Sequence, residues 1–371
     1  MNRRQFLQSA TMGAAALNAF PYHLFAGTTK KSASDRVKLG PRQVEVSRLA
    51  MGTGTNGFGG SSNQVRKLGF DGMTDLLKAA WDQGITFWDS ADAYGSQPYL
   101  GRALKSGIPR EKVTILTKTE SWTAKDMRAD LDRFRKELGT DYIDILLLHY
   151  LHDDNWLENR KGAMEVISEA QEKGIVRTKG VSCHTLGALK LAAASPWVEV
   201  DLARLNPAQV LMDSDVNTVR GVLRQMKAQG KGVIGMKILG AGALTSKPDE
   251  CLQFALAQDC LDCFTIGQES RAQMQDLVRR IPAASVLPAP MLTPSPSTTL
   301  PSSLQRSPMQ TRGPTIESLI RVWAPTEAPS SRTEVSTCAP GPTVTPRPST
   351  VRAPIVASGA SRHPSPTIAG P

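Results

Sequence analysis

The sequence predicts an α/β fold of the (β/α)8 TIM-barrel type, with an N-terminal β-hairpin and a disordered C-terminal tail. Between residues 36 and 281, apolar runs of strand length alternate with amphipathic helical patterns in eight successive units. Each unit takes about 30 residues, as in a closed barrel of eight strands and eight helices. The strands are apolar almost throughout, which is typical of parallel strands covered by helices. An open doubly wound sheet is the alternative fold.

The predicted elements follow one another with little interruption. Residues 36–54 contain the hairpin and the first barrel strand, and the other strands are predicted at 85–91, 112–118, 142–149, 176–184, 198–206, 232–239 and 262–267. The helices are predicted at 71–84, 98–107, 123–139, 161–174, 185–195, 217–230, 249–258 and 270–281. Gly84 stops the first helix, and Thr123 with Asp126 fits a capping box at the start of the third. The barrel is assigned to residues 32–285.

A glycine motif follows the first barrel strand. Gly52, Gly54 and Gly57 match the G-x-G-x-x-G pattern of dinucleotide-binding folds, which would favour the doubly wound sheet. That reading requires a helix to open directly after the glycines, but residues 58–72 have the composition of a loop. No acid lies about 20 residues further on at the end of a second strand. We therefore interpret the motif as the loop after the first barrel strand.

Residues 1–31 are predicted to be a targeting segment. Arg3 and Arg4 precede a Gly- and Ala-rich apolar stretch that is too short to span a bilayer well. The segment resembles a twin-arginine export signal, with Asn2 where a Ser or Thr is usual. It predicts the twin-arginine machinery as a partner, a periplasmic or otherwise exported location, and no stable membrane insertion. A basic amphiphilic start without a targeting role is the alternative.

Residues 286–371 are predicted to be a disordered tail rich in Pro, Ser and Thr. Residues 282–371 hold 18 of the 25 prolines in the chain and contain neither lysine nor aspartate. Such a composition offers little to form a core. The complete absence of lysine beside a lysine-containing barrel suggests an out-of-frame translation of GC-rich DNA. One continuous reading frame that keeps this tail in related genes would contradict that hypothesis and leave a genuine disordered linker.

The net charge of +10 is concentrated at the two ends of the chain. Residues 1–31 carry four basic residues and no acid, while residues 282–371 carry seven arginines and three glutamates. A net charge of +2 therefore remains for residues 32–281. Because a nucleic-acid-binding domain carries its basic residues on the folded surface, no nucleic-acid partner is predicted.

The five cysteines predict neither a redox pair nor a metal site. Cys260 and Cys263 have the spacing of a redox motif, but they bridge a helix end and a strand start, whereas a thioredoxin-like pair opens a helix. We interpret the barrel cysteines as buried structural thiols. Export to an oxidising space leaves a Cys251–Cys260 or a Cys260–Cys263 disulfide open.

Three ionisable residues end consecutive strands. Asp89, Lys118 and His149 are each the first ionisable group after an apolar run, at spacings of 29 and 31 residues. In a barrel all strand carboxyl ends meet on one face, which carries the chemistry. Tyr94, five residues after Asp89, is expected to reach over from the second loop. Each residue alone has an ordinary structural explanation, but the four together predict one catalytic cluster.

The chemistry of this cluster suits reduction of a carbonyl group. A free tyrosine has a pKa near 10, too high for an efficient acid at neutral pH, and a nearby lysine ammonium lowers it. Asp89 is expected to hold Lys118 charged and oriented, and His149 to hydrogen-bond a substrate oxygen. A tuned proton donor beside a carbonyl-binding position is what hydride reduction of an aldehyde or ketone requires.

Three segments carry a family resemblance. FWDSADAYG, ILTKTE and RADLDRFRKELGTDYIDILLLH resemble the signature segments of the aldo-keto reductases, a (β/α)8 superfamily that uses NADPH or NADH. The resemblance covers about residues 36–281. It implies a catalytic tetrad of Asp89, Tyr94, Lys118 and His149, with Tyr94 as the general acid and a hydride delivered from the nicotinamide.

The resemblance also implies a cofactor, NADP in preference to NAD. The residues expected to contact it are Gly52, Thr53, Ser182, Lys237, Gly240, Ser270, Arg271, Gln273 and Asp276. Lys237 and the small residues around Gly240 suit a pyrophosphate, because a cation and small side chains let phosphate approach closely. Arg271 suits a 2′-phosphate, whereas Glu269 suits a ribose hydroxyl and would favour NAD.

The chain departs from the family pattern around the nicotinamide. Cys183 and Leu202 replace an asparagine and a glutamine that hold the carboxamide, Met236 replaces the stacking aromatic residue, and Leu277 replaces an asparagine. Trp122, Tyr150 and Trp156 are expected either to wall the substrate pocket or to pack against the barrel rim. The sequence thus predicts an exported reductase of a small or medium carbonyl compound. The alternatives are a cofactor-binding sensor or regulatory subunit with little turnover, and a barrel isomerase or lyase acting on sugars.

Overall fold

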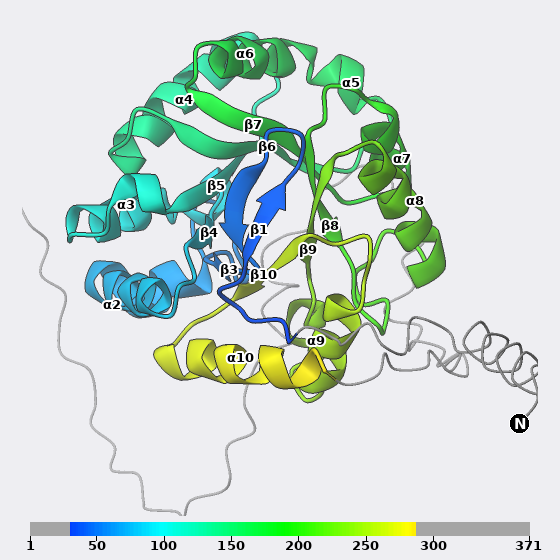
Figure 1. Ribbon diagram of the computed structural model, residues 1–371. Helices are drawn as coiled ribbons and strands as arrows, with labels where there is room; N and C mark the ends of the chain where they lie inside the picture. The colour runs from blue at the N-terminus through cyan, green and yellow to red at the C-terminus, as the bar shows by residue number, and fades with distance from the viewer. Residues whose placement is uncertain (1–29, 287–371) are drawn as a thin grey trace, which may run out of the picture. The chain divides into compact units, whose positions relative to one another are not determined.

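The computed structural model describes residues 30–286, which form the predicted barrel (Figure 1). Most of the predicted export signal (residues 1–29 of 1–31) and most of the predicted tail lie outside these residues. The barrel strands are β3 (Leu49–Gly52), β4 (Phe87–Asp89), β5 (Thr114–Thr119), β6 (Ile143–Leu151), β7 (Val176–Cys183), β8 (Val200–Arg204), β9 (Gly232–Met236) and β10 (Cys263–Gly267). Each pairs in parallel with its neighbours in chain order, and β10 pairs with β3 to close the barrel. Closure confirms the predicted fold and excludes the doubly wound sheet.

The helices lie in a ring around these strands, as Figure 1 shows. They are α2 (Asn63–Asp82), α3 (Gln97–Lys105), α4 (Ala124–Leu138), α5 (Trp156–Asn159), α6 (Lys161–Glu172), α7 (Leu186–Ala194), α8 (Val216–Ala228), α9 (Pro248–Leu256) and α10 (Arg271–Ala284). The Thr123 hydroxyl caps α4 by accepting from the Asp126 amide at 3.1 Å, as predicted. Within residues 30–286, no helix is long and apolar enough to cross a membrane.

One helix differs from the prediction. Residues 58–72 were expected to form a loop, but α2 already begins at Asn63, where the Ser62 hydroxyl accepts from the Val65 amide at 3.3 Å. The helix is interrupted at Gly69, whose φ of 59° lies in the left-handed region. The first turns of α2 are polar and precede this break, which explains why the periodic pattern reveals only the second part of the helix.

The hydrophobic core has two layers. Side chains that point outward from the strands pack beneath the helices, and a smaller cluster fills the barrel interior. The hairpin of β1 (Arg36–Leu39) and β2 (Val44–Ser47) contributes Leu39, Val44 and Val46 to the interior cluster. The predicted hairpin is therefore confirmed and closes the amino-terminal end of the barrel (Figure 1). The carboxyl-terminal end remains for the functional site.

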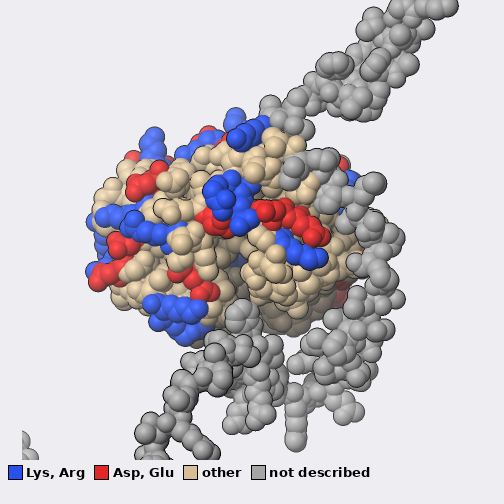
Figure 2. All heavy atoms as spheres, turned by 90° about the horizontal axis from the view of Figure 1, so that it is seen from below, with Lys and Arg blue, Asp and Glu red and all other residues tan. Residues whose placement is uncertain are grey.

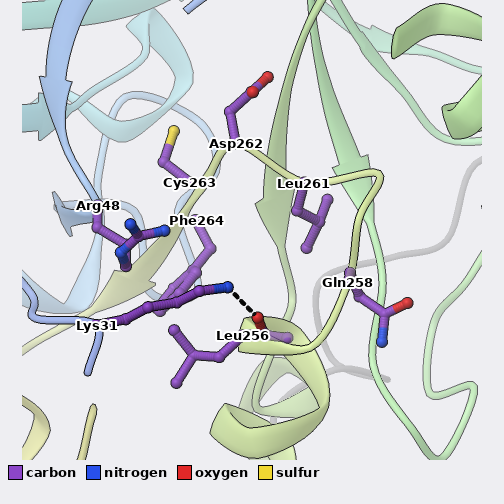
Figure 3. Close-up of a pocket in the computed structure, with 9 residues that line it drawn as sticks. Lys31, Arg48, Leu256, Gln258, Leu261, Asp262, Cys263 and Phe264 are labelled. Atoms are coloured by element: carbon purple, nitrogen blue, oxygen red, sulfur yellow. Dashed lines mark hydrogen bonds between the residues drawn. The ribbon is translucent and has the colours of Figure 1, made fainter. Parts of the chain in front are cut away.

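A small pocket lies at the closed, amino-terminal end (Figure 3). It is lined by residues that precede strands, including Arg48 and Asp262, together with Lys31 and the buried Cys263. The Lys31 ammonium donates to the Leu256 carbonyl at 2.5 Å. The Lys31 amide donates to the Ser285 hydroxyl at 3.0 Å, so the two ends of the described chain meet here. These contacts stabilise the barrel base and lie away from the reactive end.

Charges on one face of the barrel are mixed in sign. On the face that Figure 2 shows, basic and acidic side chains lie among one another. On α10, for example, Arg280 pairs with both Asp249 and Asp276. This face of the barrel therefore carries no extended patch of one sign.

Candidate active site

The four predicted catalytic residues come together at the carboxyl-terminal end of the barrel. Asp89 ends β4, Lys118 lies near the end of β5, and His149 lies near the end of β6. Tyr94 ends the short 3-10 helix Asp92–Tyr94, which follows β4. These strands are consecutive neighbours in the barrel, so regular βα spacing in the sequence becomes spatial proximity.

Lys118 is the buried centre of the cluster. Its side chain is fully buried, and its ammonium forms an ion pair with Asp89 and donates to the Ser90 carbonyl at 2.6 Å. The second oxygen of Asp89 accepts from the Thr265 hydroxyl at 2.8 Å. Burial lowers the pKa of Lys118, but the attraction of Asp89 and Tyr94 outweighs burial and keeps the pKa above its ordinary value. Lys118 is therefore a cation at neutral pH.

The Tyr94 ring lies against this cation. The Lys118 Nζ atom is 4.7 Å from the ring centre, and the His149 ring meets it edge to face at 5.6 Å. Burial raises the pKa of Tyr94, and Lys118 opposes that effect without cancelling it. Lys118 acts to lower the pKa of Tyr94, as expected. The expected net lowering of this pKa is wrong, because the effect of burial is larger than that of Lys118. The phenol is protonated at neutral pH and can donate.

His149 is a neutral imidazole. Burial holds the pKa of His149 well below its usual range, and the positive charges of Lys118 and Lys237 add to that effect. Its Nδ1 atom lies 3.5 Å from a Glu120 carboxylate oxygen and makes no hydrogen bond with any described residue. Sequence reasoning missed Glu120, although it lies only two residues after Lys118. A neutral histidine here can donate one N–H to a substrate oxygen.

Thr53 and Gly52 support the cluster. The Thr53 hydroxyl donates to the Asp89 carbonyl at 2.8 Å and lies 2.7 Å from the Ser96 hydroxyl, which in turn lies 2.7 Å from that of Ser90. The Gly52 carbonyl accepts from the buried Gln64 side chain at 3.3 Å. Gly52 and Thr53 were both expected to contact the cofactor. In the structure, their hydrogen bonds hold the strand ends in place. This chain of hydroxyl groups, which includes Ser90 and Ser96, was not predicted from the sequence.

A second group of predicted residues lies at the ends of β7 and β9. The Ser182 hydroxyl accepts from the Tyr150 amide at 3.2 Å, and Gly240 is buried just beyond Lys237. Lys237 forms no ion pair with any residue in the range 30–286. Burial lowers the pKa of Lys237, and the charges of Arg204 and Lys118 act in the same direction. A half-buried cation without an acidic partner is suited to hold an anionic ligand.

The remaining predicted residues lie at the start of α10. The Ser270 hydroxyl caps the helix, and the Gln273 side chain accepts from the Glu269 amide at 2.7 Å. Asp276 pairs with Arg280 one turn later. Glu269 is already bound by Lys67 at 2.5 Å and by Asn63 at 2.8 Å. Arg271 is exposed and forms no ion pair among residues 30–286. These pairings leave Arg271 as the accessible charge at this helix start.

The substituted positions have distinct orientations. Leu202 and Met236 belong to the cluster inside the barrel. Cys183 belongs to the layer beneath the helices, which agrees with the structural reading of the thiols. All four cysteines among residues 30–286 are free and buried. No group of three His, Cys, Asp or Glu side chains in the described barrel is arranged to hold a metal ion.

The three predicted pocket aromatics divide into two kinds. Trp122 and Tyr150 are 47% and 50% exposed and border a small pocket with His152 and Arg160. Trp156 also lines this pocket, but its side chain is buried, and its indole donates to the Ala188 carbonyl at 3.4 Å. Trp156 therefore packs against the barrel rim, while Trp122 and Tyr150 are available at the mouth.

Asp201 makes stability depend on pH. It precedes Leu202 on β8, points away from the barrel interior, and is fully buried beside the Cys183 thiol. Burial raises the pKa of Asp201 to about 7. Between about pH 4 and pH 7 the folded chain keeps a proton that the unfolded chain has lost, so stability falls as pH rises through this window.

We therefore expect Asp201→Asn to stabilise the protein selectively above pH 7. Compared with wild type, the gain in unfolding free energy should be about 2–4 kcal/mol larger at pH 8 than at pH 4, because one pKa unit corresponds to about 1.4 kcal/mol. Denaturant unfolding at the two pH values measures this difference. A substitution effect of equal size at both would show that Asp201 does not titrate in this window.

The comparisons with known proteins agree with this arrangement. The model of the aldo/keto reductase family matches residues 50–280. Aldo-keto reductase YhdN of Bacillus subtilis is 32% identical over 155 residues, which cover 38% of this chain and 44% of that protein. Aldehyde reductase YPR1 of Saccharomyces cerevisiae is 36% identical over 107 residues, 28% of this chain and 33% of that protein. The matched part thus spans less than half the length of these relatives.

Solved structures support the fold. An aldo-keto reductase from Bacillus halodurans, in its holo form, has a TM-score of 0.55 and 17% sequence identity, covering 69% of this chain and 97% of that one. At this identity the likeness concerns the barrel alone. The family model, by contrast, covers more than half of the chain and includes all four residues of the cluster. The chain belongs to the aldo/keto reductase family.

Proposed function

We propose that this protein reduces an aldehyde or ketone to an alcohol with a nicotinamide cofactor, and that Tyr94 is the general acid. The observation that carries the proposal is the convergence of a protonated phenol, a lysine cation and a neutral histidine at the open end of the barrel. Membership of an oxidoreductase family supports it. A bound nicotinamide supplies the hydride for this chemistry.

The side chains then have separate roles. The carbonyl oxygen binds between the Tyr94 hydroxyl and an N–H of His149, which orients it for attack. As negative charge develops on that oxygen, the Tyr94 proton is transferred to it and the alcohol forms. The phenolate that remains is stabilised by Lys118, which Asp89 keeps charged. A proton from water restores Tyr94 after the alcohol leaves.

We further propose NADP as the preferred cofactor. Lys237 and Arg271, which form no ion pair with another described residue, suit a pyrophosphate and a 2′-phosphate, and the Glu269 carboxylate is already held by Lys67 and Asn63. The residues present therefore fit the phosphate end of the cofactor. At the nicotinamide end, Ser182 offers a hydroxyl, whereas Leu202 and Met236 are apolar.

Arg271→Ala should separate the two cofactors. We expect the KM for NADPH to rise about 10-fold, from loss of one charge-assisted hydrogen bond at an exposed position, and the KM for NADH to stay unchanged. Arg279→Ala is the matched control, because Arg279 lies on the same helix and already pairs with Asp276. An equal rise for both cofactors would contradict a 2′-phosphate contact.

The apolar side chains of Leu202 and Met236, at the nicotinamide end of the proposed cofactor site, favour a second candidate function. This candidate is a cofactor-binding sensor or regulatory subunit with little turnover. Protein fluorescence during titration with NADPH, followed by NADPH oxidation assays against a panel of small and medium carbonyl compounds, decides between the two. Carbonyl-dependent oxidation supports the reductase, and saturable binding without oxidation supports the sensor. If NADPH neither binds nor is oxidised, both candidates are excluded, and a barrel isomerase or lyase that needs no cofactor becomes the favoured function.

We also propose export by the twin-arginine machinery, based on Arg3-Arg4 and the apolar stretch that follows. This route carries folded proteins, which suits an enzyme that binds its cofactor before export. Fusion of residues 1–31 to a folded reporter tests the proposal. A reporter that stays in the cytoplasm would contradict it.

A further inference from the structure

We infer that Gly54 and Gly57 form a slot that holds the Tyr94 ring in its proton-donating position, and that both glycines are positioning residues for the reaction proposed above. The inference gives the G-x-G-x-x-G match a role that does not involve a dinucleotide. It rests on the proposed function for its kinetic part. Its structural part, the contact between the glycines and the ring, can be tested separately.

The glycines lie against two edges of the ring. A Cβ atom added to Gly54 would lie 2.2 Å from Tyr94 Cε2 and 2.4 Å from Cζ, the carbon that bears the hydroxyl. A Cβ added to Gly57 would lie 2.4 Å from Cδ1 on the other edge. Real Cβ atoms do not approach other atoms so closely, so any side chain at either position must displace the ring.

Other groups enclose the rest of the ring. Lys118 lies 4.7 Å from the ring centre and His149 meets it edge to face. Both are buried members of the catalytic cluster. A ring pushed away from Gly54 would therefore move relative to the two groups with which it must cooperate.

The loop that carries the glycines is held in place. The buried Gln64 side chain accepts from the Thr55 amide at 3.1 Å and donates to the Thr55 hydroxyl at 2.8 Å and the Gln268 carbonyl at 3.2 Å. The Gly60 amide donates to the Ala93 carbonyl at 3.0 Å and ties the loop to the turn before Tyr94. The loop cannot retreat without breaking these bonds, so a displaced ring is the expected response to added volume.

Backbone conformation does not require glycine at these two positions. Neither Gly54 nor Gly57 has a positive φ, unlike Gly59 and Gly60 in the same loop. The left-handed φ that disfavours alanine is therefore absent at both residues. What excludes alanine is the Tyr94 ring, which makes the effect of the substitution specific to the ring.

The kinetic test compares Gly54→Ala and Gly57→Ala with Gly221→Ala in the full chain. Gly221 lies in α8, and an added Cβ meets nothing within 4 Å, so this control should keep wild-type kcat. We expect kcat for carbonyl reduction to fall about 100-fold in Gly54→Ala, as for a misplacement of about 1 Å. Cofactor affinity, measured by fluorescence, should not change. Wild-type kcat in Gly54→Ala and in Gly57→Ala would overturn the inference.

A double-mutant cycle tests the contact without reference to turnover. Gly54→Ala should lower Tm in the wild-type background but not in a Tyr94→Ala background, where the space is free. An equal loss of Tm in both backgrounds would overturn the inference, because the added methyl group would then clash with something other than the ring. A wild-type protein that fails to reduce any carbonyl compound would refute the proposed function and leave this cycle as the deciding test. If Gly54→Ala does not fold, the same cycle is measured with Gly57→Ala, whose added methyl group meets the Tyr94 ring further from the hydroxyl.

Discussion

Tyr94→Phe is expected to lower kcat for carbonyl reduction by about 10²–10⁴-fold, the usual contribution of a positioned general acid. The substitution keeps the ring in contact with Lys118 and His149 and removes only the hydroxyl. Because no part of the proposed cofactor site is touched, affinity for NADPH should stay at the wild-type value. Steady-state kinetics and a fluorescence titration measure the two quantities on one preparation.

Tyr142→Phe is the matched control for this result. The Tyr142 hydroxyl is buried and has no hydrogen-bond partner among residues 30–286. Its ring lies beneath Arg110 and Arg177, and Tyr142 directly precedes β6, whereas His149 lies near the opposite end of that strand. This variant should keep full activity. Full activity in Tyr94→Phe as well would show that another group donates the proton.

Lys118→Met is expected to lower the free energy of unfolding by about 3–5 kcal/mol at pH 7 and to abolish turnover. It leaves the Asp89 carboxylate buried without its cation, and an uncompensated buried charge has a cost of this size. The Thr265 hydroxyl remains on Asp89 and compensates only in part. Denaturant unfolding monitored by tryptophan fluorescence gives the stability change.

Arg224→Met provides the comparison. Arg224 pairs with Asp259 at 2.9 Å, but both side chains are exposed, so we expect a loss below about 1 kcal/mol. If Lys118→Met were no more harmful than Arg224→Met, Lys118 and Asp89 would not be coupled in the way the geometry indicates. Burial, rather than the ion pair itself, makes the difference between the two variants.

Much of the fold and of the cluster can be predicted from local patterns. Apolar runs bounded by turns indicate the strands, and the first ionisable residue after a run indicates which side chain reaches the carboxyl-terminal face. Asp89, Lys118 and His149 were found in this way. Tyr94 lies outside any strand and was placed in the cluster because it follows Asp89 in the second loop, while its assignment as the general acid depended on the family resemblance.

What escaped prediction depends on contacts between distant segments or on the balance of opposing effects. Gln64 binds Gln268 across 204 residues, and Thr265 binds Asp89 across 176. No local pattern reveals either bond. The raised pKa of Tyr94 depends on burial exceeding the effect of Lys118, which composition cannot decide. Thr53 was expected at the cofactor from the family resemblance, but the sequence does not encode the direction of its hydroxyl, which donates to the Asp89 carbonyl at 2.8 Å.

The contact between Lys31 and Ser285 at the barrel base bears on how the protein can be re-engineered. In a barrel trimmed to residues 31–285, a short linker could join Lys31 to Ser285, and new ends could be opened in an exposed turn elsewhere, because domains whose ends adjoin tolerate circular permutation. Immobilisation of residues 31–285 through Lys31 or Ser285 would leave the catalytic mouth facing the solution. The same adjacency makes the barrel suitable for insertion, as an intact unit, into a loop of a host protein.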